Sequence, residues 1–336
     1  MSDEVIKLGH GSGGLLTRRL IEERVLRFFD SPALAPLKDS AIVELDAGRF
    51  AFTTDSYVVD PVFFPGGDIG KLSVCGTVND LAVVGAEPIF ISCALIIEEG
   101  FPSKDLERVL RSMRDAAMEA GVEIVTGDTK VVPRGKADKI FVNTAGLGRV
   151  AKWAESLRGA AQPGDSVLVS GGVGEHAAAV LAGREGLNLQ GSLESDCAPL
   201  TDVARAVLQN ANRVSFMRDV TRGGLATVLN EAVAGESYGI VLSEADVPVR
   251  EEVRSICELL GLDPLYMACE GRLATIVDAA SARRVQEAVA RTAAGAQCRI
   301  VGSVTEGYTG SLVAQTAFGT RRLLQMLSGE QLPRIC

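Results

Sequence analysis

Acidic residues mark the ends of apolar segments at several places in this chain. Asp39, Asp55, Asp80, Asp128 and Asp219 each begin or end such a segment. Burying a carboxylate there costs free energy unless it is hydrogen-bonded or binds a cation. Mg²⁺ prefers carboxylate and phosphate oxygens, and the chain has only two histidines. A single aspartate could be a helix cap or turn residue, but the set favours a shared metal–phosphate site.

Glycines lead into predicted helices at two places, GGVGEH (171–176) and TRGGL (221–225). Free backbone N–H groups in such segments can cradle a phosphate, although ordinary turns use the same glycines. A G-x-G-x-x-G pattern spans 9–14, but the strand before it would be a four-residue stub, which argues against a dinucleotide fold. The alternatives for 9–14 are a loop that closes over a ligand and a mobile terminus.

The cysteines divide into two kinds. Their number is seven and no C-x-x-C pair occurs, so we expect neither a zinc framework nor a disulfide framework. We therefore expect the protein in a reducing cytoplasm. Cys197 is ambiguous, and Cys336 ends the chain, where structure gives no reason for a thiol. The α-carboxylate beside it should raise its pKa, so the thiol needs help to ionise. The remaining five are interpreted as small core residues: Cys75, Cys93, Cys257, Cys269 and Cys298.

Composition limits the class of protein. The chain has 336 residues and a net charge of −9, from 34 basic and 43 acidic side chains, which argues against a nucleic-acid partner. Hydrophobic residues make up 47%, as in globular proteins. No signal peptide or membrane span is recognised, so we expect a soluble, cytoplasmic protein with no membrane partner.

The elements that must position these residues fall into two α+β halves. Helices are predicted at 15–29, 69–85, 103–121, 199–211, 223–236, 250–261 and 281–293, and a strand–turn–helix at 165–176. Strands are predicted at 41–45, 49–56, 88–97, 122–128, 139–148, 239–244 and 271–277. We therefore expect domains at 1–155 and 156–318, and a flexible tail at 319–336 that could reach roughly 60 Å when extended.

Five segments together carry a family resemblance: TTDS, TVNDLAVVGAEP, TGDTKVVPRGKAD, RDVTRGGL and the terminal PRIC. In this order they resemble the HypE family of hydrogenase maturation factors, which are carbamoyl dehydratases. That family lies in the superfamily of aminoimidazole ribonucleotide (AIR) synthase and selenophosphate synthetase. The resemblance implies a two-domain AIR synthase-like (PurM-like) α+β fold and a homodimer formed through the N-terminal halves. It also implies ATP and Mg²⁺ bound between the domains.

The resemblance also implies roles for particular residues. The metal-binding acids would be Asp39, Asp55, Asp80 and Asp219, and the nucleotide site would use Asn79, Asp80, Gly127, Asp128, Asp55 and Asp219. The catalytic residues would be Lys130, Glu270 and the reactive Cys336. Three positions depart from the family pattern: one acid at Asp39 where relatives often have two, Cys269 in place of Asn before Glu270, and Glu175 in place of Asp.

The family chemistry gives the terminal thiol a task. A partner carbamoyltransferase, HypF, would place a carbamoyl group on Cys336, and ATP would phosphorylate the carbonyl oxygen. Loss of phosphate and of the N–H protons would leave a thiocyanate, whose cyano group would pass to iron on a HypC–HypD complex. Glu270 would accept a proton, and Lys130 would stabilise charge or relay a proton.

Two other functions remain alternatives. One is another enzyme of the superfamily, such as AIR synthase or selenophosphate synthetase. Selenium chemistry would favour a reactive Cys or Sec in the N-terminal loop, and the segment GHGSGG has neither. The other is a non-catalytic carrier or scaffold whose tail thiol only tethers a partner. A pure carrier has no use for magnesium-type carboxylates, so the acidic cluster favours an enzyme.

Overall fold

The computed structural model describes residues 5–6, 20–29, 48–185, 193–326, 332 and 334–336. The predicted strand 41–45, most of the predicted helix 15–29, the glycine pattern at 9–14 and Asp39 lie outside these residues. Within the first predicted helix, Ile21–Val25 forms one π-helical turn, η2.

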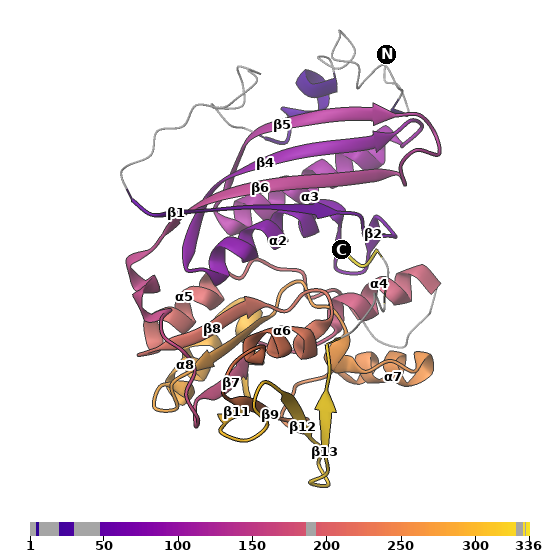
Figure 1. Cartoon of the computed structure of the whole chain (residues 1–336). Helices are drawn as coiled ribbons and strands as arrows, with labels where there is room; N and C mark the ends of the chain where they lie inside the picture. Colours follow the sequence, from indigo (N-terminus) through magenta and orange to yellow (C-terminus); the bar gives the residue numbers. More distant parts are fainter. Residues whose placement is uncertain (1–4, 7–19, 30–47, 186–192, 327–331, 333) are drawn as a thin grey trace.

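The first half is a four-stranded sheet with two helices on one face (Figure 1). The strand order is β1-β6-β4-β5, in which β4 and β5 run parallel and the other neighbours antiparallel. A short hairpin, β2 (Phe63–Phe64) and β3 (Gly67–Asp68), precedes the first helix. The elements of the main layer are β1 (Phe50–Tyr57), β4 (Ala86–Glu98), β5 (Glu123–Val132), β6 (Ile140–Val150), α2 (Ile69–Val83) and α3 (Ser103–Ala120).

The two helices are held by local sequence signals and by burial. The Asp68 carboxylate caps α2 by accepting hydrogen bonds from the N–H groups of Gly70 and Lys71, at 2.8 and 3.1 Å. Nearly every residue of α2 is buried, because it lies between the sheet and the second half of the chain. The apolar residues that recur at helical spacing in α3 are buried, and Gly121 ends that helix in the left-handed conformation. Ser103 is the first helical residue, and Pro102 is the N-cap.

The second half is a seven-stranded sheet in the order β13-β12-β9-β11-β7-β10-β8. Only β9 and β12 pair in parallel among these described strands. The strands are β7 (Ser166–Val169), β8 (Val214–Asp219), β9 (Gly239–Ser243), β10 (Leu273–Val277), β11 (Arg299–Thr305), β12 (Leu312–Gln315) and β13 (Arg321–Leu324). The helices are α4 (Glu175–Glu185), α5 (Thr201–Asn210), α6 (Gly224–Val233), α7 (Glu251–Leu260) and α8 (Ala282–Val289). Short 3₁₀ turns lie at Lys152–Ser156, Pro264–Tyr266 and Ala293–Gly295.

The two halves share a hydrophobic core. One buried cluster contains residues of α2 and α3 together with residues of α4 and α7, and Ile335 near the chain end belongs to it. The C-terminus lies beside β2, at the level where the two halves meet (Figure 1). Part of the segment predicted as a tail is therefore structured, since 321–324 form β13 and 334–336 pack against the body of the protein.

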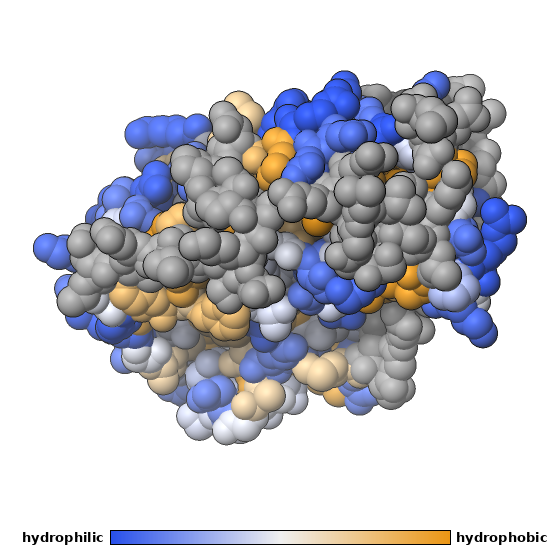
Figure 2. All heavy atoms as spheres, turned by 90° about the horizontal axis from the view of Figure 1, so that it is seen from above, coloured by the Kyte–Doolittle hydropathy of each residue, from blue (hydrophilic) through white to orange (hydrophobic). Residues whose placement is uncertain are grey.

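The surface is mixed in character. Seen from above, hydrophilic side chains alternate with smaller apolar patches (Figure 2). No helix of the described ranges combines the length and the apolar character that crossing a membrane requires.

Candidate functional site

Five of the predicted site residues line one cavity between the two halves. This cavity has a volume of about 210 Å³. The predicted residues that line it are Asp55, Asp80, Asp219, Glu270 and Cys336, together with Ser56, Tyr57, Gly76, Arg218, Thr221 and Arg222. They come from β1, α2, β8, the loop after β8, the segment before β10 and the end of the chain. The cavity is thus the place where the acidic positions converge on the terminal cysteine.

The first half positions two of the aspartates. Alternate residues of β1 point toward the helices, which directs Asp55 and Tyr57 to the same side. The Tyr57 hydroxyl donates to Asp55 Oδ2 at 3.0 Å, and the Thr53 hydroxyl donates to Asp80 Oδ2 at 2.7 Å. Gly76 permits this arrangement, because a Cβ there would lie 2.2 Å from the Tyr57 hydroxyl oxygen.

The carboxyl groups repel one another electrostatically. Burial, and then the negative charge of Asp80, raises the pKa of Asp219 to about 7. The pKa of Asp80 is raised too, chiefly by burial, although the Thr53 hydrogen bond opposes the shift. A cation or a set of N–H donors in the cavity would relieve this repulsion.

A magnesium ion at this cavity would need ligands besides the carboxylates. Among the residues that the structure describes, no three His, Cys, Asp or Glu side chains are grouped so that they could hold a metal ion by themselves. Mg²⁺ is commonly held by one or two carboxylates together with waters and substrate phosphates, so two aspartates and a bound nucleotide would suffice. Arg218 and Arg222 line the same cavity and provide positive charge for phosphates.

Glu270 is held rigidly by its backbone. Its N–H donates to the Asp196 carboxylate, at 3.2 Å to the nearer oxygen, and its carbonyl accepts from the Asn79 amide at 3.3 Å. The side chain is 3% exposed, and its Oε1 has no hydrogen-bond partner. Burial, and then the charges of Asp219 and Asp196, raises the pKa of the Glu270 carboxyl well above its usual range. A buried carboxylate with a raised pKa is a strong proton acceptor once it is ionised.

The chain end docks with its thiol against Glu270. The Cys336 thiol lines the same cavity as the Glu270 carboxyl and interacts with it, and an α-carboxylate oxygen of Cys336 accepts from Val58 N–H at 3.3 Å. Desolvation is the main cause of a raised pKa of the Cys336 thiol, followed by the charge of Glu270. The sequence predicts the same direction from the α-carboxylate, but the structure gives burial as the larger cause. The docked side chain is therefore a thiol rather than a thiolate.

Other predicted site residues lie outside this cavity lining. Lys130 and Asp128 form an ion pair of 2.9 Å on β5, and each side chain is 61% exposed. Gly127 lies where β5 approaches β4, and a Cβ there would be 2.3 Å from the Cys93 carbonyl oxygen. Asn79 is buried behind Glu270, where it also accepts a hydrogen bond from Leu200 N–H at 2.8 Å.

The two glycine segments differ in their placement. Thr221 and Arg222 line the cavity, and Gly223 and Gly224 follow them with φ angles of 78° and 62° at the start of α6. In the other segment, Gly174 N–H donates to the Cys269 sulfur at 3.1 Å, so this turn packs against a buried thiol. All seven cysteines are among the described residues and are free, and only Cys336 is not fully buried. The prediction of five structural cysteines is confirmed, and Cys197 joins them.

The sequence reasoning missed Tyr57, Arg218 and Arg222 as cavity residues. The signal for the two arginines was available, because they flank the predicted metal ligand in RDVTR. Tyr57 follows TTDS and lies two residues beyond Asp55, on the same face of the strand.

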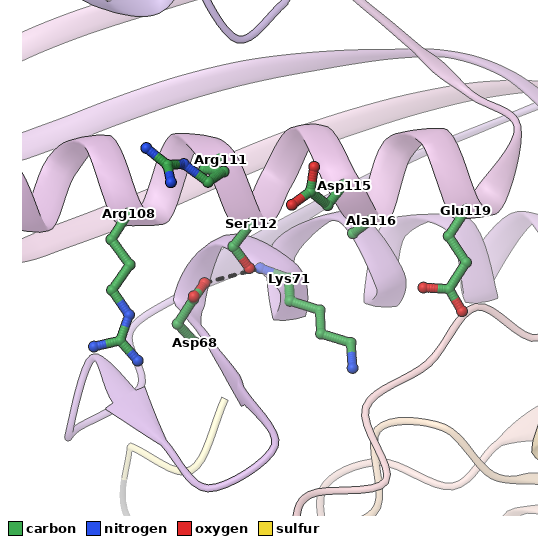
Figure 3. Close-up of a pocket in the computed structure, with 8 residues that line it drawn as sticks. All are labelled: Asp68, Lys71, Arg108, Arg111, Ser112, Asp115, Ala116 and Glu119. Atoms are coloured by element: carbon green, nitrogen blue, oxygen red, sulfur yellow. Dashed lines mark hydrogen bonds between the residues drawn. The ribbon is translucent and has the colours of Figure 1, made fainter.

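A second cavity, of about 310 Å³, lies beside α2 and α3 (Figure 3). Its lining mixes cationic and anionic side chains, which are Asp68, Lys71, Arg108, Arg111, Asp115 and Glu119, with Ser112 and Ala116. None of the predicted site residues lines it.

Family models match both halves of the chain. The model for the AIR synthase related protein, N-terminal domain, matches residues 37–150, and the model for the C-terminal domain matches 162–315. The fold and the cavity between the halves thus define a two-domain AIR synthase related protein, as the sequence predicts.

Full-length relatives identify the family within this class. Carbamoyl dehydratase HypE of Rhodobacter capsulatus is 48% identical, and the match covers 100% of this chain and 99% of the relative. A crystal structure of hydrogenase maturation protein HypE in complex with ATP has a TM-score of 0.92 and 46% identity, covering 98% of this chain and 99% of that chain. A crystal structure of a HypE–HypF complex has a TM-score of 0.78 and 41% identity, covering 92% and 99%. The chain belongs to the HypE family of carbamoyl dehydratases, which confirms the resemblance.

Proposed function

We propose that this protein uses ATP to dehydrate a carbamoyl group carried on Cys336 to a thiocyanate, which supplies the cyanide ligand for the iron of a NiFe hydrogenase. The observation that carries this proposal is the docked chain end. The terminal thiol lies against the buried Glu270 carboxyl, in a cavity lined by three aspartates and two arginines. Such a site brings together a group carrier, a base and a place for phosphates.

The reaction proceeds in two balanced steps. The carbonyl oxygen of the S-carbamoyl group attacks the γ-phosphorus of ATP, which releases ADP, and the nitrogen loses one proton. The C–O bond then breaks, phosphate leaves with both electrons of that bond, and the nitrogen loses its second proton to give S–C≡N. Phosphorylation is needed because the carbonyl oxygen is otherwise a very poor leaving group.

The residues of the cavity divide this work. Glu270 accepts a proton from the carbamoyl nitrogen, since its carboxyl is buried beside the sulfur that carries the group. Arg222 and Arg218, which also pairs with Glu231, line the cavity and would bind the phosphates. Asp55 and Tyr57, joined by a hydrogen bond, form another part of the cavity wall.

We place the ATP phosphates and Mg²⁺ at the same cavity. The aspartates that would hold the metal are Asp55, Asp80 and Asp219, with Asp39 as the fourth predicted ligand. The other predicted nucleotide residues, Asn79, Gly127 and Asp128, lie outside the lining of this cavity, so they would contact only parts of the nucleotide that extend beyond it. The relative crystallised with ATP supports nucleotide binding, and the repulsion of Asp219 by Asp80 supports a cation beside them. When bound, the metal neutralises phosphate charge. The protein contributes orientation of the carbamoyl group toward the γ-phosphate.

Lys130 enters this proposal through a homodimer. Its side chain lies on the sheet face opposite the helices, together with Phe52, which is 74% exposed, and Ile96, which is 43% exposed. We place the dimer contact on this face of the N-terminal half. Lys130 would then stabilise charge or relay a proton in a site completed by the second copy.

The proposed partners follow from the family. HypF would be the carbamoyl donor, which the crystal structure of a HypE–HypF complex supports. A HypC–HypD complex would accept the cyano group on iron. The absence of a long apolar helix within the described ranges is compatible with a cytoplasmic site of action.

Intact-mass measurement tests the proposal. The full chain is incubated with HypF and a carbamoyl donor, first without and then with Mg-ATP. We expect one carbamoyl group on Cys336 and the loss of one water only after ATP is added. Cys336→Ser should take up no carbamoyl group, whereas Cys298→Ser, which changes a buried cysteine outside the cavity, should behave as the unchanged protein.

The alternatives predict other masses. A carrier or scaffold would keep the carbamoyl group intact in the presence of ATP. Another enzyme of the superfamily would consume ATP without any adduct on Cys336. An adduct on a different cysteine would contradict the proposal directly.

A further inference from the structure

His176 is a buried residue that the proposed chemistry does not use, yet it contacts the end of the chain. It is the second residue of α4, and its side chain is fully buried. Its Nε2 lies 2.7 Å from the carbonyl oxygen of Ile335, and its Nδ1 lies 2.8 Å from the hydroxyl oxygen of Ser195. Both ring nitrogens are therefore engaged, one of them by the residue before Cys336.

The Ile335 carbonyl assigns the tautomer. A carbonyl oxygen can only accept, so the ring proton of a neutral His176 is on Nε2, where it donates to Ile335. Nδ1 is then an acceptor and takes the hydroxyl proton of Ser195, whose oxygen also accepts from Cys197 N–H at 3.1 Å. Burial lowers the pKa of His176, which keeps the ring neutral in this arrangement. The ring of Phe64 packs edge-on against the imidazole, with centroids 5.2 Å apart, and fixes its plane.

The rest of the chain end is bound through its main chain and through the Arg334 side chain, which donates to the Val58 carbonyl and pairs with Asp138. The Arg334 carbonyl accepts from Asp60 N–H at 3.1 Å and from the Arg184 guanidinium at 3.1 Å. An α-carboxylate oxygen of Cys336 accepts from Val58 N–H. The main chain therefore has a donor at each of residues 334–336, and the only buried side chain among these residues is that of Ile335, at 3% exposure. The Cys336 side chain lines the cavity beside Glu270, where it can carry a group.

We propose that His176 is the positioning residue for the reactive end of the chain, in that its Nε2–H holds the Ile335 carbonyl and thereby directs the Cys336 side chain toward Glu270. Ser195 supports it by holding the ring in the required tautomer. Without this donor the Ile335 carbonyl would be buried and unpaired, which favours departure of the chain end. The docking of the chain end does not depend on the proposed function, because it needs no substrate. Only its purpose, to present a group on Cys336, rests on that function.

Thiol labelling of the full-length protein tests the inference without ATP or a carbamoyl donor. Cys336 is the one partly exposed thiol among seven, so its rate of reaction with iodoacetamide reports how often the chain end leaves its site. His176→Phe keeps a ring of similar shape but removes both hydrogen bonds. We expect it to raise the Cys336 labelling rate about tenfold, as loss of one buried hydrogen bond would. His176→Gln, whose amide N–H can reach the same carbonyl, should restore most of the protection.

Peptide mass spectrometry separates positioning from a general loss of structure. The six buried cysteines should keep their slow labelling in His176→Phe. Equal acceleration at all seven thiols, or an unchanged rate at Cys336, would overturn the inference. Ser195→Ala is the second variant, in case His176→Phe fails to fold, and it should raise Cys336 labelling selectively. An unchanged Cys336 rate in Ser195→Ala would also overturn it.

The two proposals can fail separately. Unchanged labelling in the His176 variants would remove the positioning role without bearing on whether Cys336 carries a carbamoyl group. A missing carbamoyl adduct in the mass experiment would remove the proposed reaction, whereas the labelling rates would still report the docked chain end.

Discussion

Replacing Asp219 by Asn should change how the stability of the protein depends on pH. Burial, and then the charge of Asp80, raises the pKa of Asp219 to about 7, from about 3.9 for an unperturbed aspartate. When the pKa of an acidic group is higher in the folded than in the unfolded protein, the group stabilises the fold fully at pH values below its pKa in the unfolded chain. This contribution is lost as the pH rises toward its pKa in the folded protein. The unchanged protein should therefore lose stability between about pH 4 and pH 7, and Asp219→Asn should lose less.

The size of this effect follows from the shift. A rise of about 3 pKa units corresponds to roughly 4 kcal/mol at most, at 1.36 kcal/mol per unit. Asp80 and Asp55 lie in the same cavity and share the repulsion, so the measured difference should lie below this limit. We expect about 2–4 kcal/mol more pH-dependent loss in the unchanged protein than in Asp219→Asn.

Urea unfolding at a series of pH values, in buffers free of divalent cations, measures the effect. Asp246→Asn is the matched control, because it removes an exposed carboxylate that does not line the cavity. The free energy of unfolding of Asp219→Asn should fall less steeply between pH 4 and pH 8. Parallel curves for the unchanged protein and Asp219→Asn would refute the electrostatic reasoning about the cavity.

Three further predictions concern the cavity walls. Glu270→Gln should slow dehydration about 10²–10⁴-fold because it removes the proton acceptor, while single-turnover mass spectra still show the carbamoyl adduct; an unaltered rate would exclude that role. Gly76→Ala should lower the free energy of unfolding by about 1–3 kcal/mol, since its Cβ would meet the Tyr57 hydroxyl at 2.2 Å; calorimetry showing an unaltered melting temperature would contradict this. Asp80→Asn should weaken ATP binding with Mg²⁺ more than without it, which titration calorimetry measures; equal losses would argue against a metal contact.

The convergence of the aspartates could be predicted from the sequence. Each lies at an end of an apolar segment, and segment ends meet where layers of a fold meet. Asp55, Asp80 and Asp219 do line one cavity. The position of Asp39 stays a prediction, because that residue lies outside the described ranges. The domain boundaries at 155 and 318 stay predictions as well.

The side of the sheet on which Lys130 lies could have been predicted with closer attention to strand geometry. Residues two apart in a strand share a face, so Lys130 must lie on the same face as Asp128. Both are exposed, whereas their neighbours Thr129 and Val131 are buried beneath the helices. The family resemblance gives Lys130 a catalytic role together with Glu270. Only the three-dimensional structure shows that Lys130 lies outside the lining of the cavity in one chain.

The docking of the chain end could not be predicted from the sequence. It depends on N–H groups of Val58 and Asp60, nearly the whole chain length away, and on His176. His176 is buried because α4 packs against the first half. The Arg334 side chain adds ion pairs with Asp60 and Asp138, but partners so distant in sequence leave no local pattern in PRIC, which is why that segment indicated a mobile end rather than a bound one.

The origin of the oxygen in phosphate tests the central claim most directly. The carbamoyl group is placed on Cys336 with ¹⁸O in its carbonyl, and Mg-ATP is then added in ordinary water. The account predicts that the label appears in inorganic phosphate, while the C-terminal peptide gains a thiocyanate at Cys336. Release of the label as water, or a thiocyanate formed without ATP, would contradict it.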